Sequence, residues 1–282
     1  MRFTMDSADV FVPDGLPLEQ ALARTTHLAI AAHQDDIEIM AAAPIIECYQ
    51  QPDKWFTGVV VTDGRGSPRD GLYKDYSDEE MRLVRFKEQR KAAYVGDYAA
   101  QVILDFPSKV VKDDASRGPV DDLAAILRLS RPKFVFTHNL ADKHDTHVAT
   151  ALKAIAAIRS LPEAERPQKV YGCEVWRDLD WMVDEDKAPF DLSQHESLQA
   201  ALLGVYDSQI AGGKRYDLAS LGRRRANATY FASHGVDETL GLTYAMDLTP
   251  LALDPQREVL DFVLGHIQRF AQDVADRYKR VG

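Results

Sequence analysis

Residues 27–36 read HLAIAAHQDD, and this stretch decides the fold. The run from His27 to Ala32 is continuously apolar after its first residue, which is typical of a strand buried on both faces of a parallel sheet. His33, Asp35 and Asp36 follow directly where this strand should end. In an open α/β sheet, ligands bind beyond the carboxyl ends of the strands. We therefore expect this cluster to line a functional site.

A second polar cluster, His144-Asp145-Thr146-His147, follows shortly after the apolar stretch 134–137. Because the carboxyl ends of parallel strands meet at one edge of a sheet, we expect the two clusters to meet in space. Two histidines three residues apart also share one face of a helix. Together the clusters offer two imidazoles and a carboxylate to a divalent metal. Two further titratable groups remain to move protons, which is the inventory of a mononuclear zinc hydrolase.

Each cluster also has a purely structural interpretation. His33 could stabilise a turn, and Asp35 and Asp36 could cap a helix, as these residue types commonly do. His144 and His147 could face water on a helix surface. The position of both clusters directly after predicted strands favours the functional interpretation for the pair.

Apolar strands alternate with helical patterns along most of the chain. We expect further strands over 55–61, 101–106, 133–137 and 169–176, and helices over 44–50, 77–96, 119–129 and 146–160. This alternation is typical of βαβ units, so the predicted fold class is α/β, with a doubly wound, mostly parallel, Rossmann-like sheet. Because proline is favoured at a helix start, we expect a loop over 36–43 and a helix that begins at Pro44.

The pattern loosens in the last hundred residues or so. Helices are predicted over 193–208, 221–231 and 255–280, and the last of them is amphipathic. We therefore expect an α/β metal-dependent catalytic domain over residues 1–180 and a smaller C-terminal helical extension over residues 181–282. We interpret the extension as part of the same domain, where it would serve as a lid or as an oligomer surface.

The composition restricts the partners of the chain. A hydrophobic content of 45% and a charged content of 28% are typical of a globular protein. The net charge of −10 disfavours nucleic acid or an anionic membrane as the main partner. There is neither an apolar signal region nor a run approaching the ~20 residues of a membrane span. Cys48 and Cys173 lie far apart, as expected of core thiols. We expect a cytoplasmic protein without integral membrane contact, for which a homo-oligomer remains open.

The first cluster resembles a known signature. Ala32–Asp36 is similar to the A-H-P-D-D motif of the PIG-L (LmbE-like) family of zinc-dependent N-acetylglucosaminyl deacetylases, with Gln34 in place of proline. His144–His147 resembles the family's H-x-D-H motif, with Thr146 in place of aspartate. Further matches are Thr62-Asp63-Gly64, Arg85-x-x-Glu88, Asn139 after Thr137-His138, and a weaker one at Tyr206-Asp207-Ser208-Gln209. The resemblance mainly covers residues 26–160.

The resemblance implies roles for the two motifs. It implies that His33, Asp36 and His147 bind Zn²⁺, although these ligand types accept other divalent metals as well. It implies that Asp35 is the general base, aimed at a water whose pKa the metal lowers. His144 would stabilise the tetrahedral oxyanion and then protonate the leaving amine.

Thr146 bears on the role of His144. An aspartate at this place would favour the charged imidazolium of His144, so with threonine there His144 should lose its proton more easily. Asp145 or Asp142 could replace that carboxylate from another angle. The sequence leaves the choice between these two open.

Three more residues are candidates for substrate binding. Arg85 could hold a phosphate or sugar hydroxyls with its planar guanidinium, or it could form an ion pair with Glu88 on the helix surface. Asp63 lies on a Gly-rich loop expected near the site. Asn139 follows the predicted strand before the second cluster, where it matches the family pattern.

The residues alone indicate hydrolysis assisted by a metal. The resemblance implies the substrate: an N-acetyl group on an N-acetylglucosamine-type amino sugar or its conjugate, removed by water on the metal with Asp35 as general base. One alternative is a zinc amidase that acts on a non-sugar N-acyl substrate. Another is a metal-retaining sugar-binding module without turnover, which Thr146 keeps open.

Overall fold

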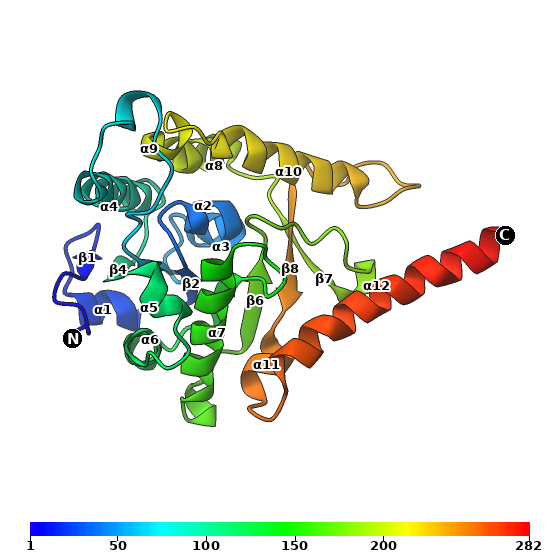
Figure 1. The fold of residues 1–282 in the computed structure, drawn as a ribbon, viewed down its shortest axis with the longest axis horizontal. Helices are drawn as coiled ribbons and strands as arrows, with labels where there is room; N and C mark the ends of the chain where they lie inside the picture. The colour runs from blue at the N-terminus through cyan, green and yellow to red at the C-terminus, as the bar shows by residue number, and fades with distance from the viewer.

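A computed structural model of residues 1–282 has at its centre a sheet of eight strands, in the order β1-β4-β3-β2-β5-β6-β8-β7 (Figure 1). Strands β2 to β6 are parallel, whereas β1 is antiparallel to β4, and β8 is antiparallel to β6 and β7. The strands are β1 (Asp9–Phe11), β2 (His27–Ala31), β3 (Phe56–Thr62), β4 (Ala100–Phe106), β5 (Phe134–His138), β6 (Lys169–Cys173), β7 (Lys187–Asp191) and β8 (Leu242–Asp247). The predicted α/β fold class is confirmed.

Helices cover both faces of this sheet, as in a doubly wound fold (Figure 1). They are α1 (Leu18–Ala23), α2 (Asp36–Met40), α3 (Ala42–Cys48), α4 (Asp78–Val95), α5 (Ser108–Lys112), α6 (Gly118–Ser130), α7 (Asp145–Arg159), α8 (Glu196–Gly204), α9 (Asp207–Ile210), α10 (Tyr216–Tyr230), α11 (Thr249–Leu253) and α12 (Val259–Val281), with short 3₁₀ turns η1 (Gly71–Tyr73), η2 (Glu163–Glu165) and η3 (Asp184–Asp186). One hydrophobic core includes residues of α1, α6, α7 and α11, and the other includes residues of α2, α3, α4 and α8. No helix is both long and apolar enough to cross a bilayer.

The order of the strands reverses at the centre of the sheet. Strand β2 pairs with β3 on one side and with β5 on the other, and the chain moves outward in both directions from this pair. All five residues of β2 are buried, as its continuous apolar sequence predicts. Because ligands bind where the strand order reverses in such sheets, the residues after β2 and β5 lie at the expected binding edge.

The prediction of a loop over 36–43 is wrong. Two short helices, α2 and α3, occupy this stretch and meet at Ala41. Pro44 is the third residue of α3, where a backbone N–H would have no helical partner in any case. The proline therefore allowed the helix to begin earlier than its position suggested.

The C-terminal part differs more from the prediction. It adds two strands, β7 and β8, to the edge of the sheet, so it is not only helical. The helix expected over 193–208 is divided into α8 and α9, and the helix expected over 221–231 begins at Tyr216. The last helix begins at Val259 and projects away from the rest of the molecule (Figure 1, red).

Candidate active site

Three side chains converge at the binding edge of the sheet. His33 Nδ1 lies 3.2 Å from Asp36 Oδ2 and 3.2 Å from His147 Nε2, and the last two atoms lie 3.3 Å apart. In a tetrahedral zinc site with bonds of about 2.0–2.1 Å, neighbouring ligand atoms are separated by about 3.3–3.4 Å. The three donor atoms are therefore spaced as the ligands of one divalent metal, and they form the one such group in the molecule.

Local structure explains why these ligands meet. The chain leaves β2 and turns sharply into α2, so that the backbone N–H of His33 donates to Asp36 Oδ2 at 2.7 Å. Asp36 is the first residue of α2 and is 3% exposed. His147 lies in the first turn of α7, which follows β5, and is completely buried. The ligands thus lie in the two segments that lead from β2 into α2 and from β5 into α7, and these two strands are neighbours in the sheet.

The charges of neighbouring side chains affect the pKa values of the three predicted metal ligands. Burial alone would raise the pKa of Asp36, but His147 and His33 hold that pKa well below its ordinary value. Burial alone would lower the pKa of His147, but the carboxylates of Asp36 and Asp142 raise it. Asp142 Oδ2 lies 3.6 Å from His147 Nδ1, on the far side of the ring from Asp36. A carboxylate at this place orients a metal-binding imidazole and increases its basicity.

His138 also supports the group, and sequence reasoning gave it no role. Its ring stacks on the ring of His147 with centroids 3.9 Å apart, and its Nε2 accepts the backbone N–H of Ala32 at 2.8 Å. Burial lowers the pKa of His138 well below its ordinary value, so the ring is neutral. Its place at the end of β5, beside the end of β2, was the available signal.

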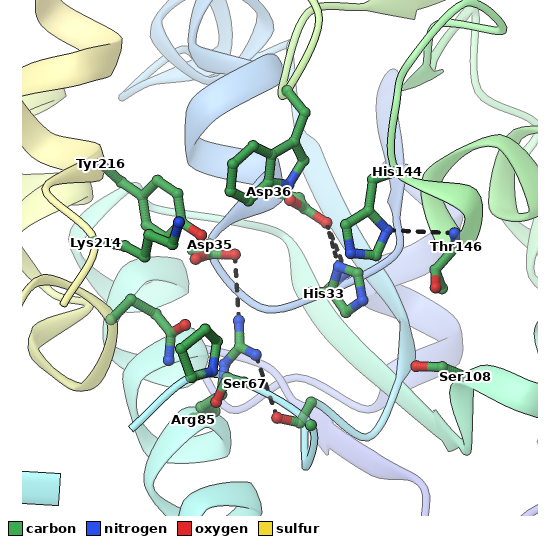
Figure 2. A pocket seen from close by; sticks show the side chains of 15 residues that line it. His33, Asp35, Asp36, Ser67, Arg85, Ser108, His144, Thr146, Lys214 and Tyr216 are labelled. Atoms are coloured by element: carbon green, nitrogen blue, oxygen red, sulfur yellow. Dashed lines mark hydrogen bonds and ion pairs between the residues drawn. The ribbon is translucent and has the colours of Figure 1, made fainter. Parts of the chain in front are cut away.

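Asp35 adopts an unusual backbone conformation beside the ligands. Its φ of 93° and ψ of −31° lie in a region that non-glycine residues rarely adopt and that is often found at functional sites. The side chain lines the cavity next to the ligands (Figure 2). Burial raises the pKa of Asp35 well above its ordinary value, against the opposing charge of Arg85. A carboxylate with a raised pKa is suited to accept a proton.

Arg85 holds this segment in place. Its guanidinium donates to the carbonyl oxygen of Gly64 at 3.2 Å, to the carbonyl oxygen of Gln34, and to Asp35 Oδ1 at 3.3 Å. The ion partner of Arg85 is therefore Asp35, whereas Glu88 accepts hydrogen bonds from Ser208. Arg85 also lines the cavity, and its contact with a substrate stays a prediction.

Gln34 and Gly64 fit together beneath the site. Gln34, which replaces the usual proline, is completely buried and donates to the carbonyl oxygen of Thr62 at 3.1 Å. Gly64 has a φ of +70°, and a Cβ there would collide with the side chain of Gln34. Glycine is therefore required at this turn. In this way Gln34 fixes the loop after β2 to the end of β3.

Asp63 and Asn139 do not line the cavity. Asp63 is mostly buried and accepts the backbone N–H of Arg65. Asn139 is completely buried, where it donates to the carbonyl oxygens of Cys173 and Arg177. Both side chains therefore fix loops at the edge of the site, and their contact with a substrate stays a prediction.

His144 lies at the start of α7 and lines the cavity (Figure 2). Its Nδ1 accepts the backbone N–H of Thr146 at 3.3 Å, so the neutral ring carries its proton on Nε2. Burial and the neighbouring His147 lower the pKa of His144, against the nearby carboxylates. Asp142 Oδ1 accepts the backbone N–H of His144 at 2.9 Å and not a ring N–H, while its Oδ2 faces His147 and accepts the backbone N–H of Trp176 at 3.1 Å. The ring of His144 is therefore hydrogen-bonded to a backbone amide, and not to the carboxylate of Asp142 or Asp145.

The cavity at this edge has a volume of about 390 Å³ and is lined mostly by polar residue types. Residues from the C-terminal part of the chain line it as well, and sequence reasoning missed most of them. Trp176 and Tyr216 meet edge to face with centroids 5.9 Å apart, and Lys214 Nζ lies 5.2 Å from the Trp176 ring. The weak match over Tyr206–Gln209 was the one signal, because Gln209 lines the cavity too.

Comparisons with known proteins agree with this architecture. A family model, PIG-L, described as GlcNAc-PI de-N-acetylase, matches residues 28–158. The chain is 20% identical to the conserved protein TT1542 from Thermus thermophilus, with a TM-score of 0.59 and coverage of 83% of this chain and 99% of that chain.

Two further solved structures have the same fold. GalB, the 4-carboxy-2-hydroxymuconate hydratase from Pseudomonas putida KT2440, has a TM-score of 0.60 at 16% identity, over 83% of this chain and 99% of that chain. The N,N′-diacetylchitobiose deacetylase from Pyrococcus horikoshii has a TM-score of 0.58 at 18% identity, over 79% of this chain and 84% of that chain. At such identities the likeness establishes the fold, and one fold can host several reactions.

Proposed function

Residues 28–158 form a PIG-L family domain, and we propose that the chain is a metal-dependent deacetylase that removes the N-acetyl group from an N-acetylglucosamine-type amino sugar or its conjugate. One observation carries the proposal: the donor atoms of His33, Asp36 and His147 lie 3.2–3.3 Å apart, and His33 and Asp36 line the same cavity as Asp35 and His144. The cavity thus combines a metal-binding group with a base and an acid.

The donor set fits Zn²⁺, which commonly binds two histidines and one carboxylate in hydrolases and keeps a position open for water. When bound, the metal supplies Lewis acidity, which lowers the pKa of water and polarises a carbonyl group. His33 is the most exposed of the three ligands, with 17% of its side chain accessible, and it borders the cavity. A substrate therefore approaches from the side of His33.

Asp35 acts as the general base in this proposal. Its carboxylate accepts a proton from the attacking water as the new bond to the acetyl carbon forms. Arg85 holds Asp35 Oδ1 at 3.3 Å, and the helix start beyond Asp35 fixes its backbone. The positive φ of Asp35 turns its side chain away from Asp36, so that one aspartate can bind the metal while the other faces the substrate.

His144 acts as hydrogen-bond donor and acid. Because Nδ1 accepts the N–H of Thr146, the proton of the neutral ring is on Nε2, from which it can be donated to the developing oxyanion. The bond between the acetyl carbon and nitrogen then breaks, and the amine nitrogen receives a proton from the imidazolium form of His144, which is restored by the proton that Asp35 took from the water. The products are acetate and the free amino sugar.

The lining of the cavity supports a sugar substrate. Its volume of about 390 Å³ is within the usual range of small-molecule sites. Trp176 offers an apolar ring surface to the C–H face of a pyranose, while Ser67, Gln209 and Lys214 offer polar groups to hydroxyls. The N,N′-diacetylchitobiose deacetylase has the same fold, and its name says that it removes an acetyl group from such an amide. GalB has the fold as well, so the fold alone does not choose deacetylation.

Acetate release tests the proposal. The purified chain is incubated with N-acetylglucosamine, N,N′-diacetylchitobiose and an N-acetylated amino acid, each with and without a chelator. We expect acetate from the amino sugars, loss of activity on chelation, and recovery when Zn²⁺ is added back. Acetate from the amino acid alone would favour the non-sugar amidase. Sugar binding by calorimetry without acetate release would favour the binding module. The absence of both acetate release and sugar binding would contradict the proposal.

A further inference from the structure

Helix α12 lies outside the PIG-L domain, and its two faces have different surroundings. One face packs against the body, where Val263 is 8% exposed and His266 Nδ1 lies 3.0 Å from Asp186 Oδ2 and 2.7 Å from a guanidinium nitrogen of Arg269. Phe270 on this side lies 6.5 Å from Trp181, measured between ring centroids. The rest of the helix projects beyond the body (Figure 1, red).

A neighbouring face of the helix carries a continuous apolar stripe. Its residues alternate at spacings of four and three, which is the spacing of the core positions in a two-helix coiled coil. We name these residues the α12 stripe: Leu260, Leu264, Ile267, Ala271, Val274, Tyr278 and Val281. All seven are exposed, and Val281 at the projecting end is 88% exposed.

A helix with such a face requires a partner. Helices gain most of their stability in proteins from packing an apolar face against another element, and an unsupported helix is marginal in water. The α12 stripe runs the whole length of the helix, from Leu260 near the body to Val281 at the projecting end. Contiguous exposed apolar surface of this kind marks a contact with another molecule.

The charges along α12 indicate the partner and its direction. The start of the helix is acidic, with Glu258 at its N-cap and Asp261 in its first turn, and the last turn carries Lys279 and Arg280. Asp276 is already paired with Lys279 within the helix, at 3.4 Å, so Arg280 is the free cation of the last turn. A second copy that runs antiparallel brings its basic end beside the acidic start of α12, whereas a parallel copy would place ends of like charge together.

We infer that α12 pairs with α12 of a second copy of this chain, antiparallel and through the α12 stripe, to form a two-fold dimer. Two observations agree with this arrangement. Ala271, the smallest residue of the stripe, lies at its middle, where the two-fold axis crosses and the helices can approach closely. At 1.5 Å per residue the helix is about 35 Å long, so each body lies beside the projecting end of its partner. Such self-complementary contacts are typical of two-fold dimers.

The mass in solution tests the dimer. We expect the full chain to sediment as a species of twice 31.6 kDa at micromolar concentration. Val274→Glu together with Ile267→Glu should give a monomer with unchanged circular dichroism and unchanged acetate release per chain. Gln268→Glu together with Gln272→Glu is the matched control, because it adds the same two charges to exposed positions of the helix outside the stripe, and it should stay dimeric. A monomeric wild type, or a dimer that survives the stripe variant, would overturn the inference.

Cross-linking tests the direction of the helices and remains informative if a charged variant fails to fold. Cys48 and Cys173 are buried, so an introduced cysteine is the reactive one. In an antiparallel pair, Leu264→Cys and Tyr278→Cys chains should form a disulfide when mixed, and neither should cross-link well alone. Ala271→Cys should cross-link to itself. Efficient cross-linking of Leu264→Cys to itself would show a parallel pair and overturn the antiparallel arrangement.

Discussion

Two buried carboxylates on the short helix α2 lie two residues apart and have contrasting surroundings. Asp36 lies among imidazoles, with its Oδ2 within 3.6 Å of ring nitrogens of His33, His138 and His147. Glu38 faces the other way and lies among neutral donors. Its carboxylate accepts the hydroxyls of Tyr98 at 2.7 Å and Tyr206 at 2.6 Å, and the amide of Gln89 at 3.0 Å.

The difference teaches how one helix serves both chemistry and architecture. The imidazoles keep Asp36 ionised and leave it suited to bind a cation. Burial raises the pKa of Glu38 to about 7, although the hydroxyls of Tyr206 and Tyr98 oppose the shift. Glu38 therefore joins α2 to distant parts of the chain. Gln89 extends this connection to the active site, because its Oε1 accepts the Asp35 N–H at 3.4 Å.

Neutralising the two carboxylates one at a time should give the largest difference between them, because only Asp36 is expected to bind the metal. Asp36→Asn replaces an anionic ligand by a neutral one, and we expect at least a ~10³-fold loss of zinc affinity together with loss of acetate release. Glu38→Gln is the matched change two residues away and should retain one metal per chain. Elemental analysis of the dialysed proteins measures both. Equal metal contents in the two variants would contradict the ligand role of Asp36.

Asp35→Asn separates the base from the ligand beside it. Asparagine has nearly the same shape and tolerates a positive φ, so the fold and the metal content should be retained. It cannot accept a proton at neutral pH, and we expect kcat to fall by about 10²–10⁴-fold. Steady-state acetate release measures the effect. Undiminished turnover with a full metal complement would make Asp35 only a structural residue.

The raised pKa of Glu38 predicts how stability depends on pH. The folded state retains a proton on Glu38 up to about pH 7, whereas the unfolded chain loses it near the ordinary value of 4.5. The contribution of Glu38 to the free energy of unfolding should therefore fall as pH rises through this window, by up to about 3 kcal/mol.

Urea unfolding of the wild type and of Glu38→Gln, at pH 5 and pH 7.5 with a chelator present, measures this contribution. The chelator removes any metal-linked stability from both proteins. We expect the wild type to lose stability relative to the variant at the higher pH. A difference between the two proteins that does not change with pH would show that Glu38 is ionised throughout.

Asp142→Asn should give the smallest of these effects. Its carboxylate lies 3.6 Å from His147 Nδ1 and supports a ligand without touching the metal position. Loss of such support typically weakens metal binding by about 10–100-fold. Competition with a chelator of known affinity measures the change. A loss as large as that of Asp36→Asn would mean that Asp142 holds the fold of this edge.

The sequence predicted the part of the site that follows the strands. His33, Asp36 and His147 could be found because the apolar run of β2 and the stretch before the second cluster end beside them. The same runs predicted the α/β sheet, since continuous apolar strands are typical of parallel pairing. Local signals sufficed because each ligand lies in the segment between a strand and the first turn of the helix that follows it.

The rest of the site depends on contacts between distant segments. Glu38 meets Tyr206 across 168 residues, and no motif announces this contact. The hydrogen bonds of Arg85 to Gln34, Gly64 and Asp35 could not be predicted either, because only the packing of α4 against the loops reveals them, and its contact with a substrate stays a prediction. Trp176 lies just after β6 and Tyr216 begins α10, and no motif in the sequence marks either residue as part of the cavity.

The most direct test of the central claim is a metal titration of acetate release. The chain is stripped with a chelator, exchanged into metal-free buffer, and given Zn²⁺ in steps while acetate release from N,N′-diacetylchitobiose is recorded. Site geometry predicts activity that rises in proportion to added metal and stops rising at one equivalent per chain, with no rise for His147→Ala. Full activity in the stripped protein, or an equal rise in His147→Ala, would contradict the account.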